Sequence, residues 1–137
     1  SLPTREFRLQ VLLVEGNRDL AGFLATALRA IRIDVSCAET AAVAAVCLRT
    51  TKPELVIANL SPVDESGWLM LSKWRLTAED LPVWFYVPQA SSRDRLWADF
   101  MHVEQLFEYG DNGRHLASAI VDRLTERLSE SFSELRD

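Results

Sequence analysis

The sequence contains little of what marks several common protein classes. Its two cysteines, Cys37 and Cys47, lack the spacing of metal-binding pairs. We expect them to be buried, reduced thiols, with a disulfide between them as the alternative. No apolar run approaches the roughly 20 residues that a membrane-spanning helix needs, and the first residues show no apolar signal-peptide region. The net charge is -5, so the basic surface that nucleic acid requires is not expected. We therefore expect a cytoplasmic protein that binds neither nucleic acid nor a membrane.

Motifs for catalysis are also scarce. Gly110 and Gly113 flank a turn before the last predicted helix, but the segment is too short for a phosphate-binding loop and lacks its lysine. His102 and His115 have no partners at metal-ligand spacing. We therefore expect no enzyme activity, no cofactor and no bound metal.

What the sequence does contain is a regular alternation of apolar strands and amphipathic helices. Hydrophobic residues make up 48% of the 137 residues, which is enough for a core. The predicted strands are 7–14, 33–37, 55–58, 83–87 and 105–109, and the predicted helices are 20–31, 41–49, 68–75, 93–102 and 114–135. Strand then helix, repeated five times, predicts an α/β fold of three layers, with one five-stranded parallel sheet covered by helices on both faces.

Sheets of this kind place their functional site at the carboxyl ends of the strands. The residues that follow or end the predicted strands there are Glu15, Gly16, Asn59, Val87 and Tyr109. These five are the candidate site residues.

Short motifs around these positions resemble bacterial response-regulator receiver domains. The resemblance is carried by the segments 11–15 and 53–57, by Gly67 and by Pro82, and Asn59 keeps the family's spacing between its phosphorylated aspartate and the loop glycine. It covers about residues 9–124. The resemblance implies the (βα)5 flavodoxin-like topology of receivers and a place in two-component signal transduction or a phosphorelay.

The same resemblance implies that the phosphorylation site is degenerate. Receivers use two adjacent acids, a nucleophilic aspartate, a hydroxyl residue and a lysine. Here Gly16 replaces the second acid, Asn59 the nucleophile, Val87 the hydroxyl residue and Tyr109 the lysine. An amide cannot form an acyl phosphate, and Glu15 alone offers too few oxygens for Mg²⁺. We expect a pseudo-receiver that neither binds Mg²⁺ nor takes up a phosphoryl group.

Further expectations concern the side chains around this site. Tyr109 is expected to fill the emptied pocket and to form a hydrogen bond with Asn59 or Glu15. Glu15 itself is expected to be solvated or bonded to nearby backbone N–H groups. Asp64 and Glu65, the nearest other acids, are expected to face water.

A surface for association is predicted on the fourth helix. The segment 96–101 holds more apolar residues than one buried helical stripe needs. In receivers this helix, the fifth strand and the fifth helix form a contact face, so Leu96, Trp97, Phe100 and Leu106 are the predicted interface for a protein partner or for a homodimer. The alternative is that the aromatic side chains of this helix fold under a neighbouring loop. The apolar stripe of the last helix continues past the domain 1–125, and we interpret residues 126–137 as an extension that leads to an output domain or ends as a tail.

The leading hypothesis is a receiver-like protein-interaction or dimerisation module that works without phosphorylation. One alternative is a phosphorylation-competent response regulator with unusual site residues. Another is a flavodoxin-like domain that binds a small ligand in the same crevice. The sequence does not name the signalling pathway or the partner.

Overall fold

Residues 8–136 are described by the computed structural model, and ten elements alternate along them. The strands are β1 (Gln10–Val14), β2 (Asp34–Ala38), β3 (Leu55–Asn59), β4 (Val83–Val87) and β5 (Gln105–Glu108). The helices are α1 (Arg18–Ala30), α2 (Ala41–Thr51), α3 (Gly67–Arg75), α4 (Ser92–Phe100) and α5 (Gly113–Arg136). The prediction of five strands alternating with five helices is confirmed.

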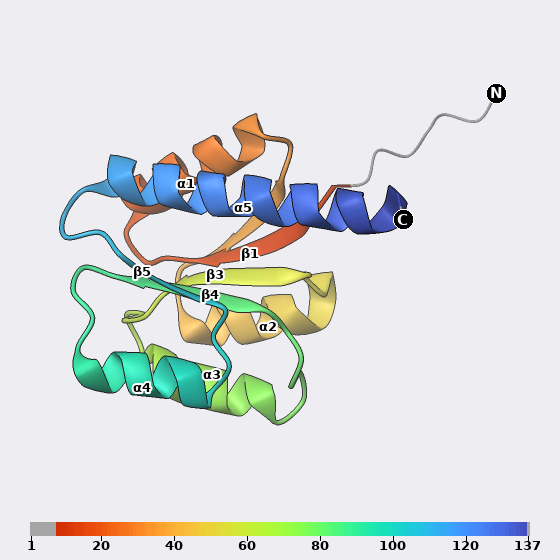
Figure 1. The fold of residues 1–137 in the computed structure, drawn as a ribbon. Coiled ribbons are helices and arrows are strands. Elements are labelled where there is room, and N and C mark those ends of the chain that lie inside the picture. The colour runs from red at the N-terminus through yellow and green to blue at the C-terminus, as the bar shows by residue number, and fades with distance from the viewer. Residues whose placement is uncertain (1–7, 137) are drawn as a thin grey trace.

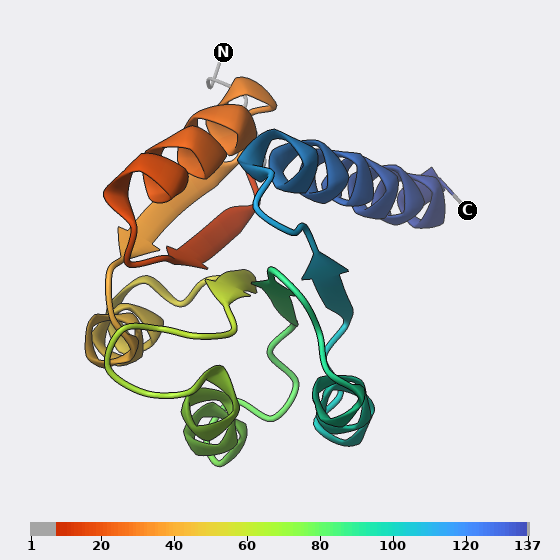
Figure 2. The ribbon, with the colours of Figure 1, turned by 90° about the vertical axis from the view of Figure 1, so that its left-hand side faces the viewer.

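The five strands form one parallel sheet in the order β2-β1-β3-β4-β5. Helices α1 and α5 cover one face of this sheet, and α2, α3 and α4 cover the other (Figures 1 and 2). All five residues of β4 and the first four of β3 are buried, so these central strands are covered on both faces. This is the predicted three-layer architecture.

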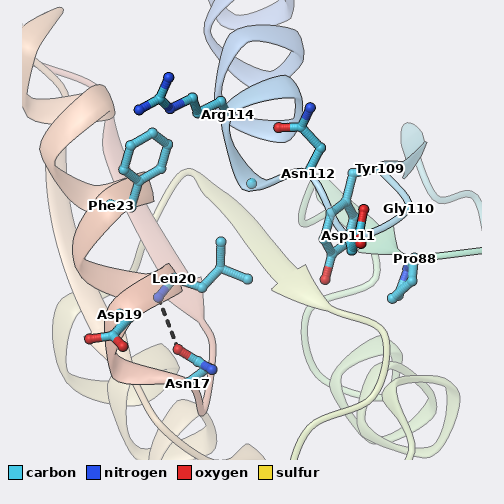
Figure 3. A pocket seen from close by; sticks show the side chains of 11 residues that line it. Asn17, Asp19, Leu20, Phe23, Pro88, Tyr109, Gly110, Asp111, Asn112 and Arg114 are labelled. Carbon is cyan, nitrogen blue, oxygen red and sulfur yellow. Dashed lines mark hydrogen bonds between the residues drawn. The ribbon is translucent and has the colours of Figure 1, made fainter.

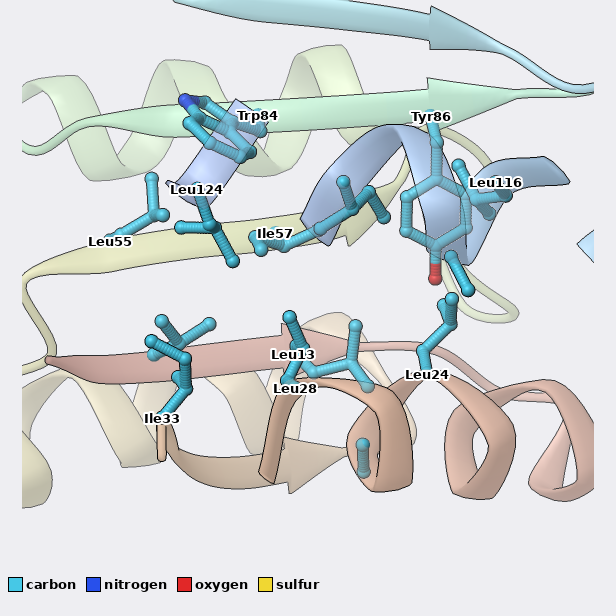
Figure 4. Packing of buried hydrophobic residues seen from close by; sticks show 14 of the residues in the cluster. Leu13, Leu24, Leu28, Ile33, Leu55, Ile57, Trp84, Tyr86, Leu116 and Leu124 are labelled. Carbon is cyan, nitrogen blue, oxygen red and sulfur yellow. The ribbon is translucent and has the colours of Figure 1, made fainter. Parts of the chain in front are cut away.

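Two apolar clusters, one on each face, hold the layers together. The larger side chains under α1 and α5 include Leu24, Leu28 and Leu116, which meet Trp84 and Tyr86 from the sheet (Figure 4). The cluster on the other face joins α2, α3 and α4 to the sheet. Burial of such side chains contributes about 1.5 to 3 kcal/mol each, so the two clusters are the main source of stability.

Local side-chain signals set the ends of helices α1 and α2. The Asn17 side chain accepts a hydrogen bond from the Leu20 N–H at the start of α1, and Thr40 caps α2 in the same way. Helix α2 ends at Thr51, where Lys52 takes a left-handed backbone conformation with φ of 46° ahead of Pro53. These caps fix where the two helices begin and end, and so they fix the loops that connect the helices to the strands.

The last helix extends to the end of the described part of the chain. Helix α5 continues to Arg136 without a break, whereas the proposed domain boundary at residue 125 stays a prediction. Residues 1–7 and 137 lie outside the described part of the chain.

Both cysteines are free, but Cys37 is exposed and Cys47 is only partly buried, so the expectation of buried thiols is wrong. Cys37 lies on β2, at the edge of the sheet, where neighbouring strands cover only one side.

Candidate functional site

The predicted site residues do lie at the carboxyl ends of the strands, but only some of them touch. Glu15 follows β1 and Asn59 ends β3, and their side chains share a hydrogen bond. Val87 ends β4 and packs into the apolar cluster beside α2, α3 and α4. Tyr109 follows β5 and lies among the residues of the opposite cluster.

Glu15 is the centre of the site and is only 5% exposed. Its Oε1 accepts hydrogen bonds from Asn59 Nδ2 at 2.9 Å and from the Tyr86 hydroxyl at 2.8 Å. Its Oε2 accepts a hydrogen bond from the Asn17 N–H at 2.8 Å. Of the two alternatives expected for Glu15, the bond to a nearby backbone N–H is the one found, and the carboxylate is buried. Three donors, two of them side chains from other strands, stabilise the buried charge.

Tyr86 is the functional residue that the sequence prediction missed. The register of the sheet pairs Asn59 with Tyr86, so the two residues lie side by side on β3 and β4. Tyr86 is fully buried, and its ring reaches from β4 toward α1 and α5, the side on which Leu24 and Leu116 lie (Figure 4). Burial, with the neighbouring negative charge of Glu15 next in importance, raises the pKa of the Tyr86 hydroxyl well above 10. This hydroxyl therefore stays protonated and keeps its role as a donor.

Tyr109 takes a supporting position, different from the predicted one. Its ring meets the Tyr86 ring edge to face, with centroids 5.9 Å apart and an interplanar angle of 69°. Within residues 8–136 its hydroxyl makes no hydrogen bond to Glu15 or Asn59, so the predicted bond is absent and Tyr86 supplies it instead. Partial burial raises the pKa of Tyr109, with the Glu15 charge as the smaller cause.

Gly16 leaves space that another residue has taken. A Cβ atom added at Gly16 would lie 2.4 Å from Val63 Cγ2 and 3.2 Å from the Glu39 carbonyl oxygen. Val63 belongs to the loop between β3 and α3, and its side chain is otherwise 77% exposed. The loop therefore lies where a second acidic side chain would begin.

The donor set does not fit a divalent metal ion. Both oxygens of Glu15 already accept hydrogen bonds. Asn59 turns its amide nitrogen toward Glu15, because only that atom can donate to a carboxylate, and its Oδ1 accepts the Ser61 N–H at 2.9 Å. Within residues 8–136 no cluster of three histidine, cysteine, aspartate or glutamate side chains is placed to hold a metal. A hard cation such as Mg²⁺ would have to displace donors that the fold supplies.

Two adjacent acids near the end of the loop between β3 and α3 tie it to the helices on either side. Asp64 accepts hydrogen bonds from the Ala41 and Ala42 N–H groups at the start of α2, at 2.8 and 3.1 Å. Glu65 pairs with Lys73 on α3 at 2.8 Å. Asp64 is exposed, as expected, but it does more than face water, because its carboxylate also caps a helix from a distant part of the chain.

We expect Asp64→Asn to lower the melting temperature at neutral pH and to weaken its dependence on acid. The hydrogen bond from Ala41, first among several, holds the pKa of Asp64 below its usual value. A carboxyl with a lowered folded pKa stabilises the fold above its unfolded pKa, about 3.9, and this contribution is lost as the pH falls below it. Thermal unfolding from pH 3 to 7, with Glu65→Gln from the same loop as control, measures the effect. Equal acid dependence in Asp64→Asn and wild type would contradict it.

An open hollow of about 780 Å³ lies beside the site. It is bordered by Phe23 on α1, Tyr109 in the loop before α5, and Arg114 in the first turn of α5 (Figure 3). Glu15 and Asn59 are not among the described residues that line it. The hollow therefore adjoins the buried hydrogen-bond network through Asn17, which lines it and donates its N–H to Glu15, but the hollow does not reach the Glu15 and Asn59 side chains.

The predicted interface residues differ in exposure. Leu96, Trp97 and Phe100 on α4 are 70%, 42% and 80% exposed, and together they line a shallow hollow of about 360 Å³. Leu106 on β5 is half-buried and packs against the cluster beneath α4. The three α4 side chains therefore form an apolar surface, to which Leu106 contributes little area.

Comparison with solved structures shows which fold this arrangement belongs to. The chain is similar to the signal receiver domain of a protein described as a Luxo repressor from Vibrio parahaemolyticus, with 23% identity, a TM-score of 0.75, and coverage of 93% of this chain and 98% of that one. It is similar to a CheY-like receiver domain protein from Methanospirillum hungatei, with 17% identity, a TM-score of 0.75, and coverage of 90% and 99%. It is also similar to the non-phosphorylated HemR receiver domain from Leptospira biflexa, with 22% identity, a TM-score of 0.75, and coverage of 84% and 93%.

The receiver fold predicted from the sequence is therefore confirmed. No family model matches the chain. No curated protein matches it significantly. At these low identities the similarity shows a shared fold, and the roles of individual residues rest on the geometry above. Among residues 8–136, no helix combines the length and the apolar character needed to cross a bilayer.

Proposed function

We propose that this chain is a receiver-like module of two-component signalling that acts through protein association and takes up no phosphoryl group. The fold, shared with receiver domains over most of their length, supports the signalling role. The exposed apolar side chains of α4 support association. We infer that the module works in the cytoplasm and that it is not an enzyme.

One observation carries the proposal: the strand ends that hold the receiver's reactive groups are closed by an internal hydrogen-bond network. Glu15 is saturated by donors from Tyr86, Asn59 and the backbone of Asn17. Asn59, in the place of the nucleophile, has an uncharged oxygen and a delocalised nitrogen lone pair, so it cannot attack phosphorus and form an acyl phosphate. The residues that would have served phosphoryl transfer now stabilise one arrangement of the strand ends.

Closing the site also removes the groups that would stabilise a phosphoryl charge. Val87 lies in the apolar cluster and offers no hydroxyl, and Tyr109 offers no positive charge. A bound phosphoryl group would lie beside the buried Glu15 carboxylate without a cation to offset the repulsion. A regulatory input by phosphorylation at this site is therefore not expected.

Incubation with acetyl phosphate and Mg²⁺ is expected to leave the intact mass of the protein unchanged. The reason is the absence of a nucleophilic carboxylate and of a metal site. Mass spectrometry of the intact chain measures the outcome, with a phosphorylatable receiver in the same reaction as the positive control. A mass gain of one phosphoryl group that hydroxylamine removes would overturn the proposal and favour the phosphorylation-competent alternative.

A further inference from the structure

We propose that a second copy of this chain docks on the outer surface of α3 and α4, with the two α4 helices antiparallel. We call this the α3–α4 surface, and its apolar residues are Leu69, Leu76, Leu96, Trp97 and Phe100. The inference rests on the association role proposed above and names both the partner and the face. The proposed contact lies on α3 and α4, whereas the contact face expected from the sequence lay on the fourth helix, the fifth strand and the fifth helix.

The direction of the α4 side chains sets this face. Asp94, Ala98 and Met101 turn toward the molecule, since they are the least exposed residues of the α4 segment. Arg95 lies on the flank toward β5, where its guanidinium pairs with Glu108 at 2.8 Å. The flank toward β5 is therefore polar.

The apolar side chains of α4 lie on its outer side and toward α3. Leu96, Trp97 and Phe100 follow Arg93 at the spacing i, i+3, i+4, i+7, which places all four on one stripe of the helix. The Trp97 ring meets the Trp68 ring of α3, with centroids 6.2 Å apart. The stripe therefore continues onto α3 rather than onto β5.

Helix α3 and the residue after it add two further exposed leucines. Leu69 is 49% exposed, and Leu76, directly after the last turn, is 85% exposed. Helices α3 and α4 lie next to each other on the same face of the sheet (Figures 1 and 2). Exposed apolar side chains on two neighbouring helices are a feature of interaction surfaces.

The two helices are held in a fixed relation, which favours docking. Near the start of both helices the Trp68 Nε1 donates to Asp94 Oδ1 at 3.1 Å. Near their ends the Arg75 guanidinium donates to the carbonyl oxygens of Met101 at 3.3 Å and Leu81 at 2.6 Å. A surface that is already ordered loses little conformational entropy on binding.

The charges at the two ends of the α3–α4 surface favour a second copy of the chain as the partner, in antiparallel orientation. Arg93 is exposed at the start of α4 and, within the described residues, has no ion pair. At the other end Phe100 shares a hollow of about 550 Å³ with Glu79, Asp80 and Arg75, so two acids outweigh one arginine there. An antiparallel two-fold pairing places Arg93 of each copy near the acids of the other. A parallel pairing would place Arg93 against Arg93.

The surface is small, so the association is expected to be reversible. Each helix has 9 residues, which corresponds to a length of about 14 Å. A stable complex buries about 800 Å² on each partner, whereas this contact comes from two short helices, so the dimer should depend on protein concentration.

Phe100→Ser is expected to weaken the dimer of the full chain by about tenfold or more, because an exposed aromatic anchor loses its partner. Phe23→Ser on α1 is the control, since Phe23 is also an exposed phenylalanine, and α1 covers the opposite face of the sheet (Figures 1 and 2). Sedimentation across protein concentration measures association, and circular dichroism verifies the fold. A wild type that stays monomeric to high-micromolar concentration, or equal effects of both variants, would overturn the inference.

A charge exchange tests the antiparallel orientation independently of folding. Arg93→Glu and Glu79→Arg should each weaken the dimer about fivefold by placing like charges together, and the double variant should regain most of the loss. A double variant that associates no better than the single variants would exclude the antiparallel contact. Acetyl phosphate labelling, measured on the same samples, reports on the proposed function separately, because neither residue lies near Glu15.

Discussion

Replacing Tyr86 with phenylalanine is expected to lower the free energy of unfolding by about 2 kcal/mol at pH 7. The substitution keeps the ring in the cluster beneath α1 and α5 and removes only the hydroxyl. That hydroxyl donates to Glu15 at 2.8 Å, and the buried carboxylate would lose one of its three donors. The cost is therefore electrostatic and not a loss of packing.

The difference between wild type and Tyr86→Phe should become smaller in alkali. Burial holds the pKa of Tyr86 well above 10 in the folded protein, whereas a tyrosine in the unfolded chain has a pKa of about 10. A group with a raised folded pKa stabilises the fold below its unfolded pKa and loses this contribution as the pH rises. Above pH 10 the gap should narrow by up to about 1.4 kcal/mol per pH unit.

Urea unfolding of both proteins between pH 7 and 11 measures these effects. Tyr109→Phe is the matched control, because its hydroxyl makes no hydrogen bond to Glu15 and its pKa is raised less. Equal stability of wild type and Tyr86→Phe at pH 7 would show that the hydroxyl does not support Glu15. The closed state of the site would then need another explanation.

The sequence predicted the sheet and the strand-end positions because these depend on local patterns. Alternating apolar runs and amphipathic stripes specify the ten elements, and caps such as Asn17 and Thr40 are visible from residue type alone. The proposed correspondence of Asn59 to the receiver nucleophile also depended only on an ordered set of short motifs. These features do not require knowledge of which side chains meet across the sheet.

Tyr86 was not predicted, because its role depends on the sheet register. Within the apolar run 83–87 it looks like one more core residue, and only the pairing of Asn59 with Tyr86 brings it to the site. One signal was present, since a buried tyrosine hydroxyl normally requires a hydrogen-bond partner. On a central strand next to Asn59, the nearby acid Glu15 was the available partner.

The loop residues and the face of α4 show the same dependence on long-range packing. Asp64 caps a helix that begins 23 positions earlier, and no spacing rule connects the two. The sequence showed that α4 has more apolar residues than one buried stripe needs, but it did not show which neighbouring element these residues face. It follows from the contact of Trp97 with Trp68 and from the pairing of Arg95 with Glu108.

Asn59→Asp is expected to lower the free energy of unfolding by about 3 kcal/mol at pH 7, more than any other single change considered. The amide that now donates to Glu15 at 2.9 Å would become a second carboxylate beside a buried one. Two carboxylates at this distance repel each other, and a donor is lost as well. Protonation of one of them relieves the repulsion, so the deficit should shrink as the pH falls toward 4.

The same single change is not expected to restore efficient phosphorylation. Glu15 would still be bound by Tyr86 and by the Asn17 backbone, and Gly16 would still supply no second ligand. Adding Gly16→Asp and Tyr109→Lys should raise labelling by acetyl phosphate beyond the sum of the separate gains, because the groups act together. The new side chain at position 16 also requires Val63→Ala, since its Cβ would otherwise lie 2.4 Å from Val63 Cγ2.

Asn59→Ala separates loss of the donor from gain of the charge. It removes the same hydrogen bond without adding a carboxylate, so it should be less destabilised than Asn59→Asp at pH 7 and should show no recovery in acid. Chemical unfolding between pH 4 and 7, together with intact-mass analysis after acetyl phosphate treatment, measures both halves of the argument. If Asn59→Asp alone were as stable as wild type and became labelled as readily as a phosphorylatable receiver, then Glu15 and the strand ends would still form a working site. The network of Tyr86 and Asn59 around Glu15 would in that case be a resting arrangement that a single carboxylate can open.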